Sequence, residues 1–150
     1  MSSTFQAQSS LAQRYQEIRE FTERLVEPLS AEDCMIQSMP DTSPMRWHMA
    51  HTTWFFETFV LGSLPGYQVF DEPFGFPFNS YYNTVGDQFP RPQRGLISRP
   101  GLNEIKDYRR YVDDQMEELF DSEVPEDLRY AIEVGLNHEQ QHQELMLTDI

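Results

Sequence analysis

Four stretches of this 150-residue chain repeat apolar side chains every three or four residues, and this period restricts the fold more than any other feature. They run over residues 11–29, 41–61, 102–120 and 124–150. An α-helix turns once in ~3.6 residues, so such side chains gather on one face that must be buried. No alternation typical of β-strands runs long enough to compete. The pattern predicts an all-α protein, a four-helix bundle.

Local signals place the ends of these helices. Ser30 and Asp33 resemble a capping box and predict a short helical piece after the first helix. Ser43 can cap the next helix, Pro44 suits its first position, and Gly62 is a plausible stop. The first helix has an apolar face, widened by two further residues, that contains Leu11, Tyr15, Ile18, Phe21, Leu25, Val26 and Leu29.

Between Gly62 and Gly101 the helical period disappears. The segment holds eleven Gly and Pro residues before Gly101, interleaved with many aromatic residues. A flexible linker would not carry so many aromatic side chains. We therefore expect a long ordered loop, and long ordered loops inside compact domains often serve function.

Composition excludes several classes of protein. The net charge of −14 disfavours nucleic-acid binding, which needs a basic surface. Cys34 is the only cysteine, which excludes an internal disulfide and a cysteine-rich zinc site. No stretch reaches the ~18 apolar residues of a membrane-spanning helix, and the first ten residues lack the pattern of a signal peptide. These features predict a soluble cytoplasmic protein.

Two histidines, His138 and His142, lie one turn apart in the last stretch, "NHEQQHQELML". Counting ~100° per residue puts both inside the apolar face of that helix, which contains Leu128, Ala131, Ile132, Gly135, Leu145 and Met146. This spacing lets two imidazoles of one helix bind one metal. The alternative is that they are core residues satisfied by hydrogen bonds.

A third histidine favours the metal site. His51, in "RWHMAHTTWFFETF", shares a helix face with Trp47 and Trp54 and is expected to point inward from a second helix. His48 lies about 60° further round by the same helical count and is the weaker candidate. Three inward imidazoles leave other metal positions open for substrate or dioxygen. They suit Fe, Zn, Cu and Ni alike, and the lack of a nearby cysteine disfavours structural zinc.

Glu139 lies near the same face and has three possible roles. Its carboxylate can orient a histidine ligand as a second-shell acceptor. It can replace one histidine in a site of two histidines and one carboxylate. It can also form an ion pair with an arginine of another helix, and the sequence leaves these alternatives open.

Three segments in order, "SPMRWHMAHTTWFFETFVL", "FNSYYNTVGDQFPRPQRGLISRP" and "NHEQQHQELMLTDI", resemble the N-terminal domain of ergothioneine-biosynthesis sulfoxide synthases, or hercynine oxygenases. The resemblance extends from about Leu11 to Ile150. It implies a DinB-like four-helix domain over residues 1–150 that binds non-haem Fe(II) through His51, His138 and His142. The reaction that it implies joins a cysteine-type thiol, cysteine or γ-glutamylcysteine, to C2 of trimethylhistidine (hercynine) with O2.

The resemblance also suggests substrate-binding residues. Gln141 matches a position that contacts the trimethylated histidine. The carboxylates of the thiol substrate need cationic partners, and Arg91, Arg94 and Arg99 are the candidates. No catalytic acid or base is assigned.

Family members continue into a second domain that resembles sulfatase-modifying factors, and this chain stops at Ile150. We therefore expect the chain to keep the iron ligands and to lack efficient sulfoxide synthesis on its own. Two other functions compete: a DinB-like zinc- or nickel-dependent thiol transferase, and a non-enzymatic helical binding domain.

Overall fold

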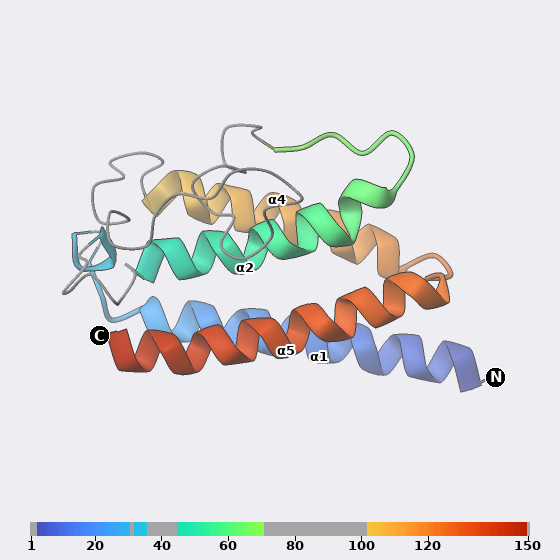
Figure 1. The fold of residues 1–150 in the computed structure, drawn as a ribbon, viewed down its shortest axis with the longest axis horizontal. Coiled ribbons are helices and arrows are strands. Elements are labelled where there is room, and N and C mark those ends of the chain that lie inside the picture. Colours follow the sequence, from blue (N-terminus) through green and yellow to red (C-terminus); the bar gives the residue numbers. More distant parts are fainter. Residues whose placement is uncertain (1–2, 31, 36–44, 71–101, 150) are drawn as a thin grey trace.

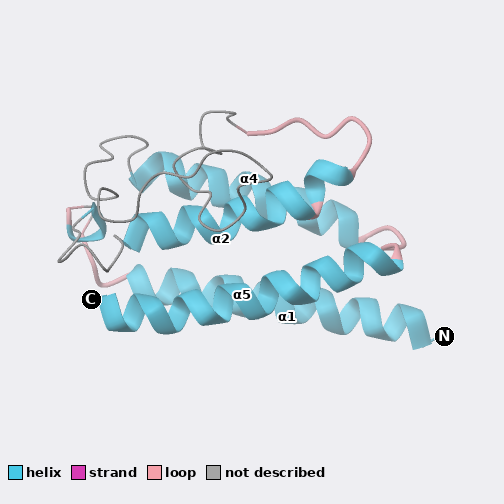
Figure 2. Ribbon diagram, viewed as in Figure 1, coloured by secondary structure: helices cyan, strands magenta, loops and turns pink. Residues whose placement is uncertain are grey.

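The structure of the chain is a computed structural model that describes residues 3–30, 32–35, 45–70 and 102–149 (Figure 1). Its α-helices are α1 (Ser3–Val26), α2 (Met45–Phe59), α4 (Leu102–Phe120) and α5 (Glu126–Asp149), with short 3-10 helices η1 (Asp33–Met35) and η2 (Leu61–Ser63). Figure 2 shows helices and loops but no strand among the described residues. The predicted all-α fold is confirmed.

The four α-helices form two layers, α1 beside α5 and α2 beside α4 (Figure 1). Helix α2 also packs against α5, and α1 against α4, so the helices enclose one core. The apolar period of residues 102–120 corresponds to one buried face of α4, which contains Ile105, Tyr108, Val112, Met116 and Leu119. None of the helices that the structure describes is long and apolar enough to cross a membrane.

Two apolar residues assigned to the core from sequence are exposed instead. Phe21 of α1 is 43% exposed, because the polar side chains of Arg19 and Thr22 occupy the inward face there. Leu145 of α5 is 37% exposed, whereas its neighbour Met146 is buried. The spacing of apolar residues therefore predicted both helices correctly, but the buried faces predicted from it were too wide.

The capping box predicted at Ser30 and Asp33 is present in the structure. The Ser30 amide donates to the Asp33 carboxylate at 3.0 Å, and the Asp33 amide donates to the Ser30 hydroxyl at 3.1 Å. The proposed cap at Ser43 and Pro44 lies outside the described residues. Helix α2 ends at Phe59, before the expected stop, and Gly62 belongs to η2.

Most of the expected long loop, residues 71–101, also lies outside the described residues. Its beginning is held by Glu57, which accepts hydrogen bonds from the hydroxyls of Tyr67 and Tyr108, both at 2.7 Å. The Phe70 amide donates to the same carboxylate at 3.0 Å. The chain leaving α2 is thus joined to the side of α4.

Gly135 lets α5 approach α2 closely. A Cβ atom built on Gly135 would lie 2.5 Å from Cε1 of Phe56 and 3.1 Å from Cδ1 of Phe55. Phe56 is fully buried and meets the ring of Tyr15 edge-on at 5.0 Å, so it has little room to move. Any larger residue at position 135 would separate the two helices that carry the histidines.

Candidate metal centre

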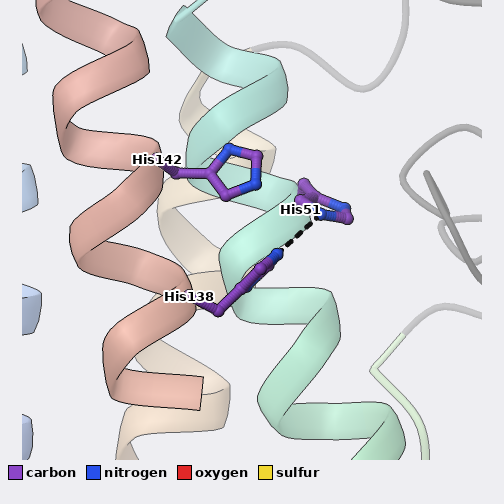
Figure 3. A group of neighbouring side chains, drawn as sticks. All are labelled: His51, His138 and His142. Atoms are coloured by element: carbon purple, nitrogen blue, oxygen red, sulfur yellow. Dashed lines mark hydrogen bonds between the residues drawn. The ribbon is translucent and has the colours of Figure 1, made fainter. Parts of the chain in front are cut away.

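Helices α2 and α5 bring three histidines together in the core. His51 comes from α2, and His138 and His142 come from consecutive turns of α5 (Figure 3). Each residue offers one ligand atom, and these atoms all lie within 4.8 Å of one another. His51 and His142 are buried and His138 is half-buried. We call His51, His138 and His142 the three-histidine group.

The distance between His51 and His138 fits shared coordination. Their Nε2 atoms lie 3.1 Å apart. Two nitrogens that each lie ~2.1 Å from one metal, at angles from square to tetrahedral, are separated by roughly 3.0–3.4 Å. This pair therefore already has the separation of two ligands on one ion. The widest separation in the group, 4.8 Å, requires a modest movement of the third nitrogen.

Aromatic rings line the three-histidine group. The His51 ring stacks on Trp47 with centroids 4.4 Å apart, and on Trp54 at 5.6 Å. The His138 ring stacks on Phe55 at 4.8 Å. These contacts fix the planes of the imidazoles and surround them with apolar surface, which lowers the local dielectric constant and limits access of water.

The protonation of His138 suits a ligand. Burial lowers the pKa of His138 to about 4, although nearby Glu139 opposes this. The imidazole is therefore neutral at neutral pH, which is the form that binds metals. Its Nδ1 atom is buried and makes no hydrogen bond. The Nε2 atom, 3.1 Å from Nε2 of His51, is the one placed to bind a metal, and Nδ1 then carries the proton of the neutral ring.

A fourth histidine, His48, lies against the three-histidine group. Its Nδ1 lies 2.9 Å from Nδ1 of His142, and its side chain is buried. His48, the weaker ligand candidate from sequence, is not part of the three-histidine group, yet its ring contacts that of His142. It sits one turn before His51 on α2, and the close approach of α5 brings it within reach of His142. The spacing His48-x2-His51 was the available signal.

Glu139 points from α5 toward α1 and α4, away from α2. Arg19 donates to its Oε1 at 2.9 Å, and Arg109 donates to its Oε2 at 3.3 Å. The Thr22 hydroxyl donates to Oε2 at 2.6 Å. The ion pair with arginines of other helices, one of the three alternatives, is the arrangement observed.

Other charged residues complete this arrangement. Arg19 also donates to Asp113 at 2.7 Å, and Arg109 to Glu23 at 2.6 Å. We call Arg19, Glu23, Arg109, Asp113 and Glu139 the charge network. Burial alone would raise the pKa of Glu139, but the two arginines outweigh it and hold that pKa below the ordinary value. The carboxylate is ionised and fully paired at neutral pH.

The predicted substrate-binding residues are only partly visible. Gln141 is exposed on α5, one residue before His142. Arg91, Arg94 and Arg99 lie outside the described residues. The structure therefore brings together the three predicted metal ligands, leaves the side chain of Gln141 exposed, and adds His48.

The comparison with protein families covers nearly the whole chain. A model of the DinB superfamily matches residues 14–146, which include all of α2 and α4, most of α5, about half of α1 and every histidine. The chain belongs to the DinB superfamily. No curated protein matches it. In this DinB-superfamily chain, the three-histidine group could hold a metal ion, and the identity of the ion follows from neither the fold nor the family.

Proposed function

We propose that this DinB-superfamily domain binds non-haem Fe(II) through His51, His138 and His142. We propose further that it is the iron-binding part of an O2-dependent hercynine sulfoxide synthase. The observation that carries the proposal is the convergence of three imidazoles from two helices, all ligand atoms within 4.8 Å. The motifs around these histidines support the assignment to ergothioneine biosynthesis.

Three neutral nitrogen donors suit an ion that must keep positions open for substrates. Bound Fe(II) would supply the redox chemistry with O2 that amino-acid side chains cannot supply. The aromatic surface from Trp47, Trp54 and Phe55 keeps bulk water from the reacting groups. A site of this kind positions substrates and limits side reactions, and geometry decides which bond forms.

The proposed reaction balances without another reductant. The thiol S–H and the imidazole C2–H bonds break, and a C–S bond and an S–O bond form. One oxygen atom of O2 enters the sulfoxide, and the other leaves as water with the two hydrogens. The organic substrates together lose the four electrons that O2 gains, so cysteine or γ-glutamylcysteine, hercynine and O2 are sufficient substrates.

Two sets of side chains would select the substrates. Gln141, exposed beside His142, offers an amide that can hydrogen-bond a polar group of the trimethylated histidine. Arg91, Arg94 and Arg99 would pair with the carboxylates of the thiol substrate. In this proposal a second domain of the family type completes the substrate pocket, and the present domain contributes the metal ligands.

The first experiment is anaerobic reconstitution of the chain with Fe(II), followed by measurement of metal content and affinity. His51→Ala and His138→Ala remove ligands from different helices. Gln140→Ala, an exposed position on α5 between the two histidines, is the matched control. We expect one Fe(II) per chain, retained by the control and lost by both histidine variants.

Other results would redirect the assignment. Preference for zinc or nickel over iron would favour a DinB-like thiol transferase, because the same nitrogen set suits those metals. A folded chain that binds no metal, with little loss of stability in His142→Ala, would favour a non-enzymatic helical binding domain. If Fe(II) binds, hercynine binding to the iron-loaded chain and to Gln141→Ala is the next measurement.

A further inference from the structure

His48 and His142 are in direct contact through the same ring atom. Their Nδ1 atoms lie 2.9 Å apart, and their ring centroids lie 5.1 Å apart at 57°. Two nitrogens at this distance form a hydrogen bond only when one carries the proton and the other presents its lone pair. The two imidazoles must therefore occupy opposite tautomers at Nδ1.

The metal site decides which ring donates. Because Nδ1 of His142 faces His48, the atom that His142 would present to a metal is Nε2. Figure 3 shows the His142 ring turned so that a nitrogen faces His51 and His138. A ligating Nε2 needs its lone pair, so the proton of the neutral ring must lie on Nδ1. His142 is then the donor and His48 the acceptor.

We propose that His48 is a positioning residue for the metal centre: it accepts a hydrogen bond from Nδ1–H of His142 and so fixes the tautomer and ring orientation that present Nε2 to the metal. Metal-binding histidines usually donate their second N–H to a carboxylate, a carbonyl or water. Here an imidazole would take that place. The inference rests on the proposed metal-binding function and deepens it.

The surroundings of His48 favour such a role. Its side chain is buried, and Trp47 meets its ring edge-on at 5.5 Å. The backbone carbonyl of His48 also accepts a hydrogen bond from the Thr52 hydroxyl at 3.0 Å, within the same helix. Glu139, the acid next to His138 in sequence, does not compete for this place, because the two arginines take its carboxylate.

Two substitutions separate positioning from other roles. His48→Asn keeps an acceptor oxygen on the atom equivalent to Cγ, close to the place of Nδ1. His48→Leu removes the acceptor and keeps an apolar side chain of comparable bulk. Loss of an outer hydrogen-bond partner typically weakens metal binding about 10- to 100-fold, and we expect a loss in this range for His48→Leu. His48→Asn should retain most of the wild-type affinity.

The affinities are measured with Fe(II) and with Co(II), whose visible absorption reports the number of ligands. Circular dichroism and urea denaturation establish that both variants are folded. In addition, long-range 1H–15N NMR of the metal-free wild-type chain identifies the protonated nitrogen of each imidazole. We expect Nδ1–H on His142, and a lone pair on Nδ1 of His48.

Each contrary outcome is distinct. An affinity of folded His48→Leu equal to wild type would overturn the proposal. Loss of binding in both variants as complete as in His138→Ala, with a changed Co(II) spectrum, would make His48 a fourth ligand instead. A proton on Nε2 of metal-free His142 would also contradict the proposal. If wild type bound no metal, the proposed function would fail, and the NMR assignment would still decide the direction of the hydrogen bond.

Discussion

The two sides of α5 bury polar groups in opposite ways. On the side that faces α1 and α4, the Glu139 carboxylate receives hydrogen bonds from Arg19, Arg109 and Thr22. On the side that faces α2, the buried Nδ1 of His138 has no hydrogen bond, and two pairs of imidazoles meet nitrogen to nitrogen. A fully paired network stabilises one packing of the helices, whereas the Nε2 atoms of His51 and His138, 3.1 Å apart, are spaced so that they can share one cation.

This difference assigns separate tasks to neighbouring residues. Glu139 follows His138 directly in sequence, yet it contacts different helices. Its ion pairs fix the rotation of α5 about its own axis, and that rotation directs His138 and His142 toward α2. Gln143 adds to the same restraint, because its side-chain amide donates to the Ile18 carbonyl at 2.8 Å. Damage to the charge network should therefore affect the fold first and the metal site second.

The largest effect is expected from Glu139→Gln. The substitution leaves Arg19 and Arg109 buried beside a neutral amide, and breaking a buried ion pair in this way costs roughly 3–5 kcal/mol. Urea denaturation measures the free energy of unfolding. Glu133→Gln is the control, since Glu133 lies on the exposed surface of α5, where it pairs with Arg14 of α1. Loss of this exposed ion pair should change the free energy of unfolding by less than about 1 kcal/mol. Equal effects of the two variants would contradict the assigned role of the charge network.

Metal binding to the histidines of α5 should stabilise the folded state. A ligand at a free concentration of about 100 times its dissociation constant stabilises the folded state by about 2.7 kcal/mol. We expect Fe(II) to raise the thermal unfolding temperature of the wild type and of Gln140→Ala under anaerobic conditions. His138→Ala should show no such rise. A rise of equal size in His138→Ala would mean that the ion binds elsewhere.

Gly135→Ala tests the close approach of α2 and α5. The new methyl group would overlap the Phe56 ring, and overpacking of this kind costs about 1–3 kcal/mol. The higher helix propensity of alanine returns at most ~1 kcal/mol, so a net loss of stability is expected. Fe(II) affinity should also fall, because the helices separate. In the double variant with Phe56→Leu, the two changes should cost less than their sum. Full additivity would show that the ring and the methyl group do not meet.

The smallest effect on stability is expected from a moderate fall in pH. The arginines hold the pKa of Glu139 below its ordinary value of 4.5, so the folded state favours the ionised carboxylate. Stability from this group is fully present above that value and is lost as pH falls below it, through the lower pKa of the folded state. Urea denaturation over this range should show a steeper loss of stability in wild type than in Glu139→Gln. Parallel curves would remove Glu139 as a source of acid sensitivity.

Sequence periodicity predicted the helices and the three convergent histidines, because both depend on a 100° turn per residue that tertiary packing does not change. It did not predict the partner of His48. A helical wheel reports direction within one helix, whereas contact with His142 depends on how closely α5 approaches α2, and Gly135 sets that distance. For Glu139, the sequence offered three roles, and the choice required knowing that Arg19 and Arg109 converge from two other helices.

The hydrogen bonds of Glu57 bear on how well the long connection between α2 and α4 tolerates insertions and replacements. By binding Tyr67, Phe70 and Tyr108, it brings the chain at residue 70 against α4, where the rings of Phe70 and Tyr108 are 5.4 Å apart. Tyr108 lies only six residues, roughly 9 Å along the helix axis, from Leu102. Phe70 and Leu102, which flank this connection, thus both lie near the same end of α4. Closing such a loop costs only about 0.6 kcal/mol more when its length doubles, so insertions and replacements there should leave the bundle intact.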